Sequence, residues 1–223
     1  MLKLFAPLAA AAAILAAPVA AAQDAETSAR AAPLDLTIET DQNVDPDNVW
    51  LLDLSNGERV AIRLKPDWAP NHVERIKTLT RQGFYDGVIF HRVIDGFMAQ
   101  TGDPTGTGTG GSQLPDLAAE FNRVPHMRGT VSMARAQAED SANSQFFIVF
   151  YPRFSLDRNY TNFGRVIANM GAVDAIQRGE PPANPTRILQ ASLASQAKTQ
   201  VLPQVAPQLT GPAASIAEVP LSE

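Results

Sequence analysis

An arginine stands among apolar residues in one short segment of this 223-residue chain. Alternate residues of a β-strand share a face, so Arg92 would lie beside three apolar side chains, Val88, Phe90 and Ile94. A guanidinium at the edge of a sheet is simply solvated, whereas a partly buried one needs a hydrogen-bond partner. Gln100, which follows a short turn, is a suitable partner, with Met98 on the same face of the returning strand. The segment predicts an Arg–Gln pair next to apolar side chains, a pattern that suits either a functional site or an edge charge.

A second segment combines an amide with aromatic rings. Gln145 and Phe147 would share one face of a strand. Ala134 and Arg135 precede them in another strand-like run. By itself this pattern equally suits core aromatic residues with one buried amide. The alternate residues would face the other way: Phe146, Ile148 and Phe150.

Composition excludes several other kinds of site. The chain has no cysteine, so disulfides, thiolate nucleophiles and thiolate metal sites are impossible. Its three histidines are widely separated, and we expect no metal and no cofactor. A Gly-x-Gly-x-x-Gly run at 106–111 opens no helix, which argues against a dinucleotide, and no Gly-x-Ser-x-Gly nucleophile motif is present. The net charge is −5 without any basic run, so we expect no nucleic-acid partner.

The first 22 residues have the features of a cleaved signal peptide. Lys3 precedes an apolar, alanine-rich stretch of about 16 residues, which is short for a membrane span. Ala20-Ala21-Ala22 then fits the signal-peptidase rule. We expect export, to the periplasm in a bacterium, and no membrane contact after cleavage. Residues 23–43 are polar and mixed and are expected to form a linker.

From 44 to 193 the chain alternates strand-like runs with turns. A helix is expected to begin at Asn71, with Glu74 completing a capping box, and to end at Gly83; a second helix covers 172–177. Many short strands with few helices predict a mainly β domain built as a closed antiparallel barrel. Residues 194–223 are rich in Ala, Pro, Gln and Ser and are expected to form a mobile tail. The expected strands are 49–54, 60–64, 88–94, 97–100, 130–134, 145–150, 163–167 and 188–193.

Together and in this order, the segments resemble the cyclophilin family of peptidyl-prolyl cis/trans isomerases over roughly residues 49–193. The stretch from Phe90 to Asp103 is similar to the family signature, and two later blocks, Ser144 to Ile148 and Leu156 to Val166, follow in the expected order. The resemblance implies a closed eight-stranded cyclophilin-like barrel with two capping helices. It also implies a monomer without cofactor that acts on proline-containing unfolded or flexible polypeptides.

The resemblance assigns roles to particular residues. It implies that Arg92 and Gln100 are catalytic. Ser155 stands where many members carry a tryptophan, so we expect weak binding of cyclosporin-type cyclic peptides. Arg135 replaces a frequent asparagine and Tyr160 a frequent histidine, which should alter substrate preference rather than abolish activity. The implied substrate-binding residues are His91, Phe97, Met98, Ala134, Arg135, Gln145, Phe147, Leu156 and Tyr160.

The chemistry expected of Arg92 is a hydrogen bond made only in the transition state. Rotation about an X–Pro bond crosses a free-energy barrier of about 18–20 kcal/mol because amide resonance is lost. The twisted proline nitrogen regains a lone pair, so a guanidinium bound to it stabilises the transition state more than the ground state. Such a hydrogen bond contributes about 1.5–3 kcal/mol net. The remaining reduction of the rotation barrier must come from an apolar pocket and from holding the peptide in place.

Two other functions stay open on the sequence. A non-catalytic module could use the same pocket to hold proline-containing loops of a partner, and a holdase chaperone could use exposed apolar area. The complete set of Arg, Gln, Phe and Met residues favours the isomerase, because binding alone does not require the Arg–Gln arrangement.

Overall fold

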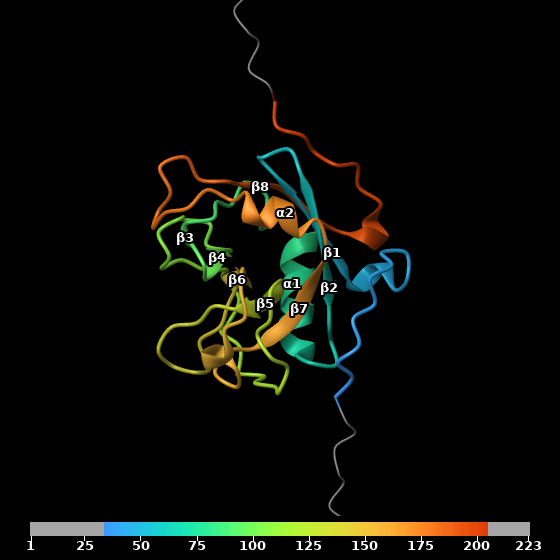
Figure 1. Ribbon diagram of the computed structural model, residues 1–223, viewed down its shortest axis with the longest axis vertical. Helices are drawn as coiled ribbons and strands as arrows, with labels where there is room; N and C mark the ends of the chain where they lie inside the picture. Colours follow the sequence, from blue (N-terminus) through green and yellow to red (C-terminus); the bar gives the residue numbers. More distant parts are fainter. Residues whose placement is uncertain (1–33, 205–223) are drawn as a thin grey trace, which may run out of the picture. The chain divides into compact units, whose positions relative to one another are not determined.

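The computed structural model describes residues 34–204, so the signal peptide predicted at 1–22 lies outside the described residues. In the described range no helix is long and apolar enough to cross a membrane. The helices are α1 (Pro70–Arg81) and α2 (Met170–Asp174), with short 3-10 turns η1 (Pro46–Asn48), η2 (Phe154–Leu156) and η3 (Ala194–Gln196) (Figure 1). The strands are β1 (Val49–Leu54), β2 (Arg59–Leu64), β3 (Arg92–Ile94), β4 (Met98–Thr101), β5 (Thr130–Met133), β6 (Phe146–Val149), β7 (Asn162–Ala168) and β8 (Ile188–Leu193).

The strands form one curled antiparallel sheet in the order β3-β4-β6-β5-β7-β2-β1-β8. The mainly β class and the eight strands are confirmed, but the prediction of a closed barrel is wrong: the sheet is a half-barrel whose edge strands β3 and β8 share no ladder. The strand β3 has only three residues. The two edges meet instead at an isolated bridge between Ile89 and Arg187, ahead of both strands.

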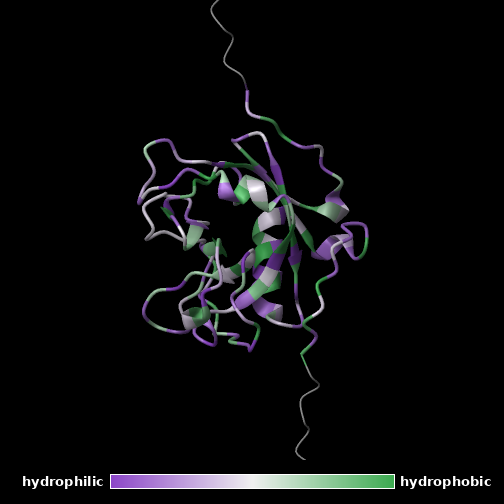
Figure 2. Ribbon diagram, viewed as in Figure 1, coloured by the Kyte–Doolittle hydropathy of each residue, from purple (hydrophilic) through white to green (hydrophobic). Residues whose placement is uncertain are grey.

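The curled sheet encloses a single large core. Inward residues of the strands alternate with outward ones, as the pleat requires, and Trp50 of β1 packs against Phe146 of β6 with ring centroids 4.8 Å apart. The amphipathic α1, with hydrophobic and hydrophilic residues mixed along it, adds Val73, Ile76 and Leu79 to the same core (Figure 2). This packing makes the sheet a rigid base for side chains on its outer face.

The predicted face of the strand around Arg92 was wrong. Phe90 and Val93 both lie in the main core, whereas Ile94 packs on the opposite side. Alternation breaks because β3 begins only at Arg92, and Phe90 before it donates its N–H to the carbonyl of Thr186 instead. In β6 the predicted faces are confirmed.

The start of α1 also differs from the prediction. The helix begins at Pro70, which suits the first helical position because it has no N–H to satisfy. Asn71 therefore lies inside the helix, and its N–H and that of His72 donate to Glu120, at 3.1 and 3.0 Å. A carboxylate from a distant loop thus takes the place of the predicted capping box with Glu74. The predicted end is confirmed, since Gly83 follows the helix with φ of +71°. The second helix covers Met170–Asp174 rather than 172–177.

Segments on both sides of the predicted domain are hydrogen-bonded to the sheet. The buried guanidinium of Arg63 in β2 donates to four backbone carbonyls between residues 39 and 45. The carboxylate of Asp53 in β1 accepts from the N–H of Val201 at 2.8 Å. The boundaries at 44 and 193 stay predictions, but these contacts fasten parts of the predicted linker and tail to the domain.

Candidate active site

The strand order brings the two polar and aromatic clusters of the sequence into one row. Arg92 on β3 lies opposite Gln100 on β4, which lies opposite Phe147 on β6. Directly opposed residues of antiparallel strands point to the same side, here the outer face of the sheet. Arg92 is therefore beside an amide and an aromatic ring although more than fifty residues separate it from the latter.

An apolar cluster separate from the main core lines this face. Met98, Phe147, Val149 and Leu156 are its buried members. Tyr160 packs its edge against Phe147, with centroids 5.6 Å apart and planes at 83°. The cluster and the polar row together surround a cavity of about 250 Å³. Its lining holds nine of the predicted site residues: Arg92, Phe97, Met98, Gln100, Ala134, Arg135, Phe147, Leu156 and Tyr160.

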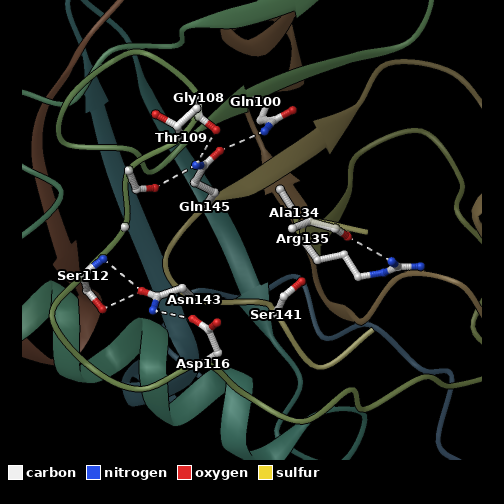
Figure 3. A pocket seen from close by; sticks show the side chains of 13 residues that line it. Gln100, Gly108, Thr109, Ser112, Asp116, Ala134, Arg135, Ser141, Asn143 and Gln145 are labelled. Atoms are coloured by element: carbon white, nitrogen blue, oxygen red, sulfur yellow. Dashed lines mark hydrogen bonds between the residues drawn. The ribbon is translucent and has the colours of Figure 1, made fainter. Parts of the chain in front are cut away.

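A second, larger cavity of about 510 Å³ adjoins the first and shares Gln100, Ala134 and Arg135 with it. Gln145 lines this second cavity, with the glycine-rich loop on one side and Asn143 on the other (Figure 3). The guanidinium of Arg135 donates to the carbonyl of Asn159 and lies 5.0 Å from the ring centre of Tyr160. The predicted binding residues thus form two connected hollows.

A directional chain of hydrogen bonds links the glycine-rich loop to Arg92. The carbonyls of Gly108 and Gly110 can only accept, so Gln145 turns its NH₂ group to them, at 3.0 and 2.8 Å. Its oxygen then accepts from the NH₂ of Gln100 at 2.9 Å, as Figure 3 shows. The oxygen of Gln100 is left to face Nη1 of Arg92, 3.5 Å away. Each amide orientation follows from the one before it.

The glycine-rich loop is itself held by a buried carboxylate that sequence reasoning missed. Asp103 is fully buried and accepts backbone N–H groups from Thr105, Thr107, Gly108 and Gly110 at 2.6–3.1 Å. Burial alone would raise its pKa, but these hydrogen bonds outweigh burial and lower the pKa to about 2, from an ordinary value of 3.8. The signal in the sequence was an aspartate three residues before the glycine-rich run at 106–111.

His91 is the one predicted site residue that lines neither cavity. Its ring is buried, and within residues 34–204 neither ring nitrogen has a hydrogen-bond partner. A Cβ placed on Gly108 would lie 3.5 Å from the His91 ring, so the imidazole sits beneath the glycine-rich loop. Burial lowers its pKa, although the nearby carboxylate of Asp103 opposes this shift. Its role in substrate binding stays a prediction.

A Ser–His–Asp chain with a buried serine and a buried histidine lies behind the aromatic wall, and the sequence did not reveal it. His126 bonds Asp157 through Nδ1 at 2.8 Å and Ser132 through Nε2 at 2.7 Å. Its ring stacks on Phe147, at 6.5 Å between centroids and 19° between planes. Although the order of groups matches that of hydrolases, Ser132 is fully buried and no substrate can reach it. The trio positions Phe147 and is not a nucleophile.

Arg92 has a charged partner that the sequence did not suggest. Its Nε donates to Glu180 Oε2 at 2.8 Å, and the two side chains are 41% and 52% exposed. Glu180 comes from the loop between α2 and β8, 88 residues further along the chain. Its Nη1 faces the Gln100 oxygen at 3.5 Å, and the residue lines the smaller cavity.

Comparisons with known proteins identify relatives of this chain. The model of the family "Cyclophilin type peptidyl-prolyl cis-trans isomerase/CLD" matches residues 51–193. A probable peptidyl-prolyl cis-trans isomerase of Brucella suis is 46% identical over 177 residues, which cover 72% of this chain and 90% of the relative. A crystal structure of a cyclophilin from Hirschia baltica superposes with a TM-score of 0.64 at 30% identity, covering 74% of this chain and 77% of that one.

A second solved structure, a Cryptosporidium parvum cyclophilin-type isomerase in the presence of the dipeptide Ala-Pro, superposes with a TM-score of 0.61 at 26% identity. It covers 65% of this chain and 98% of its own. The family model alone spans most of the domain that carries the groove. This chain belongs to the cyclophilin family and is a peptidyl-prolyl cis-trans isomerase.

Proposed function

We propose that the enzyme accelerates X–Pro rotation by donating a hydrogen bond from Arg92 to the proline nitrogen while the bond is twisted. The observation that carries this proposal is the row Arg92–Gln100–Phe147 at the edge of an apolar cavity. A proline ring seated against Phe147 and Met98 would hold its nitrogen near the guanidinium. The planar nitrogen has no lone pair to offer, so the bond strengthens only at the transition state.

The apolar wall of the cavity also stabilises the twisted transition state relative to the planar ground state. A twisted amide is less dipolar than a planar one, and a dry surface of Phe147, Met98 and Leu156 disfavours it less than water does. All three of these side chains are buried in their own cluster, so the wall needs no rearrangement to receive a ring. No proton moves in the rotation, which explains why the groove needs no base and no nucleophile.

The substrates we propose are proline-containing segments of unfolded or newly exported polypeptides, bound by a monomer. The related Cryptosporidium parvum isomerase was crystallised in the presence of Ala-Pro, which supports proline-containing peptides as ligands of this groove. The larger cavity beside the proline site, about 510 Å³ in volume, offers room for a residue that precedes the proline.

One assay separates this function from the two alternatives. The chain without its first 22 residues should accelerate cis/trans exchange of a peptide containing Ala-Pro, measured by a protease-coupled assay or by exchange NMR. A binding module would bind the peptide without raising the exchange rate. A holdase would suppress aggregation of an unfolded protein equally well when Arg92 is replaced. If the chain is an isomerase, we expect its acceleration of the refolding of that protein to disappear in the Arg92 variant.

We also propose that the enzyme works after export, because the first 22 residues have the pattern of a cleaved signal peptide. Fractionation of a bacterium that produces the full chain should recover it from the periplasm with Gln23 as the first residue by N-terminal sequencing. Recovery from the cytoplasm with Met1 or Leu2 at the N-terminus would contradict the proposal.

A further inference from the structure

The loop between α2 and β8 enters the active site through one short antiparallel contact with β3. Val93 donates its N–H to the carbonyl of Gly179 at 2.8 Å, and Gly179 donates back to Val93 at 2.9 Å. In an antiparallel pair, the residue before one partner lies opposite the residue after the other. The bridge between 93 and 179 therefore places Glu180 directly opposite Arg92.

The backbone leaves little freedom at this contact. Gly179 has φ of +142°, and a Cβ there would lie 2.6 Å from the Cα of Pro182, so only glycine fits. Pro181 has no N–H to extend the ladder, so the pairing is confined to this point. The backbone of Glu180 is consequently held opposite Arg92, and its carboxylate lies 2.8 Å from the guanidinium Nε.

The two polar partners of Arg92 hold different edges of its guanidinium. Glu180 accepts from Nε at 2.8 Å, and Gln100 faces Nη1 at 3.5 Å. We propose that Glu180 is a positioning residue for the isomerase reaction: it fixes the plane of the Arg92 guanidinium so that its Nη donors stay directed at the groove. This inference rests on the proposed role of Arg92 and adds the element that aims it.

Glu180 would affect the reaction rate because it restricts the flexible Arg92 side chain, and not because the ion pair between them is strong. Both side chains are partly exposed, and an exposed ion pair adds little to stability. A half-exposed arginine without a fixed partner, however, samples many rotamers, most of which point away from the substrate nitrogen. Because catalysis by positioning depends steeply on geometry, a contact that hardly affects stability can still affect the rate.

The test compares Glu180→Gln and Glu180→Ala with a matched control in the chain without its first 22 residues. The control is Asp95→Asn, which breaks the ion pair between Asp95 and Arg178 at 3.2 Å. That pair ties the same loop to the turn after β3 without touching Arg92. We expect Glu180→Ala to lower kcat for an Ala-Pro peptide about fivefold, with KM changed less than twofold. Glu180→Gln, whose amide oxygen can still accept from Nε, should lose less, and the control should leave both constants unchanged.

Two further readouts show whether the effect passes through Arg92. The NMR resonance of the Arg92 Nε–H group, identified by its loss in Arg92→Lys, should shift in Glu180→Gln and stay in place in Asp95→Asn. In the Arg92→Ala background, Glu180→Gln should cause no further loss of turnover. An unshifted resonance, a further loss in that background, or a Glu180→Gln variant with turnover at or above that of the native chain would overturn the inference. If Arg92→Ala itself keeps full turnover, the proposed function fails instead.

Discussion

The Arg92→Ala variant should isomerise an Ala-Pro peptide at least tenfold more slowly than the native chain. A charge-assisted hydrogen bond contributes about 1.5–3 kcal/mol, and each decade of rate corresponds to about 1.4 kcal/mol. The loss should appear in kcat, because the proline nitrogen offers its lone pair only in the twisted state. The measurement is the exchange rate at several peptide concentrations, which separates kcat from KM.

A control variant distinguishes lost charge from lost geometry. Arg92→Lys keeps a positive charge but has no planar donor fork, so we expect activity between those of the native chain and Arg92→Ala. The Arg92 side chain is 41% exposed, and both variants should keep the native melting temperature within a few degrees. Full turnover in a folded Arg92→Ala variant would contradict the mechanism.

The Asp103→Ala variant should lose about 3 kcal/mol of unfolding free energy, because hydrogen bonds to a charged group contribute about 1.5–3 kcal/mol and the variant removes the acceptor of several. Four backbone N–H groups of the glycine-rich loop depend on this carboxylate. Its loss should also lower turnover, since Gly108 and Gly110 orient Gln145 and, through it, Gln100. Urea unfolding and the peptide assay measure the two effects.

The pH dependence of the unfolding free energy tests whether the ionised Asp103 carboxylate is the source of this stabilisation. Folding lowers the pKa of Asp103 to about 2 from 3.8, so its contribution of about 2 kcal/mol is fully present above pH 3.8 and is lost as the pH falls towards 2. The stability difference between the native chain and Asp103→Asn should therefore shrink over that range. Asp67→Asn, on an exposed ion pair with Lys65 at 3.4 Å, should change stability by less than about 0.5 kcal/mol. A difference that stays constant between pH 2 and 6 would exclude the carboxylate as its source.

Local sequence signals predicted most of the strands and the Arg–Gln pair, whereas the other site residues were implied by the resemblance to the cyclophilin family. Alternation in 145–150 placed Phe147 and Phe146 on opposite faces, as the structure confirms. The strands expected at 49–54 and 60–64 are β1 and β2, and Gly83 follows α1 as expected. Arg92 and Gln100 were predicted as partners from a short turn between two strands, and they are opposed in the observed register. Each of these features depends on residues close together in the chain.

The closure of the sheet and the supports of the site depend on contacts between distant segments, and these only the tertiary structure decided. Whether β3 pairs with β8 depends on how the segments before both strands pack; those segments meet at one bridge, and the two strands share no ladder. Glu120 at the start of α1, Glu180 beside Arg92 and Asp157 behind Phe147 come from loops without periodic pattern. Residue types and local spacing thus determined which side chains could do the chemistry. Because a loop's path is set by the closing of the whole chain around its core, the partners that aim those side chains were settled only by the fold.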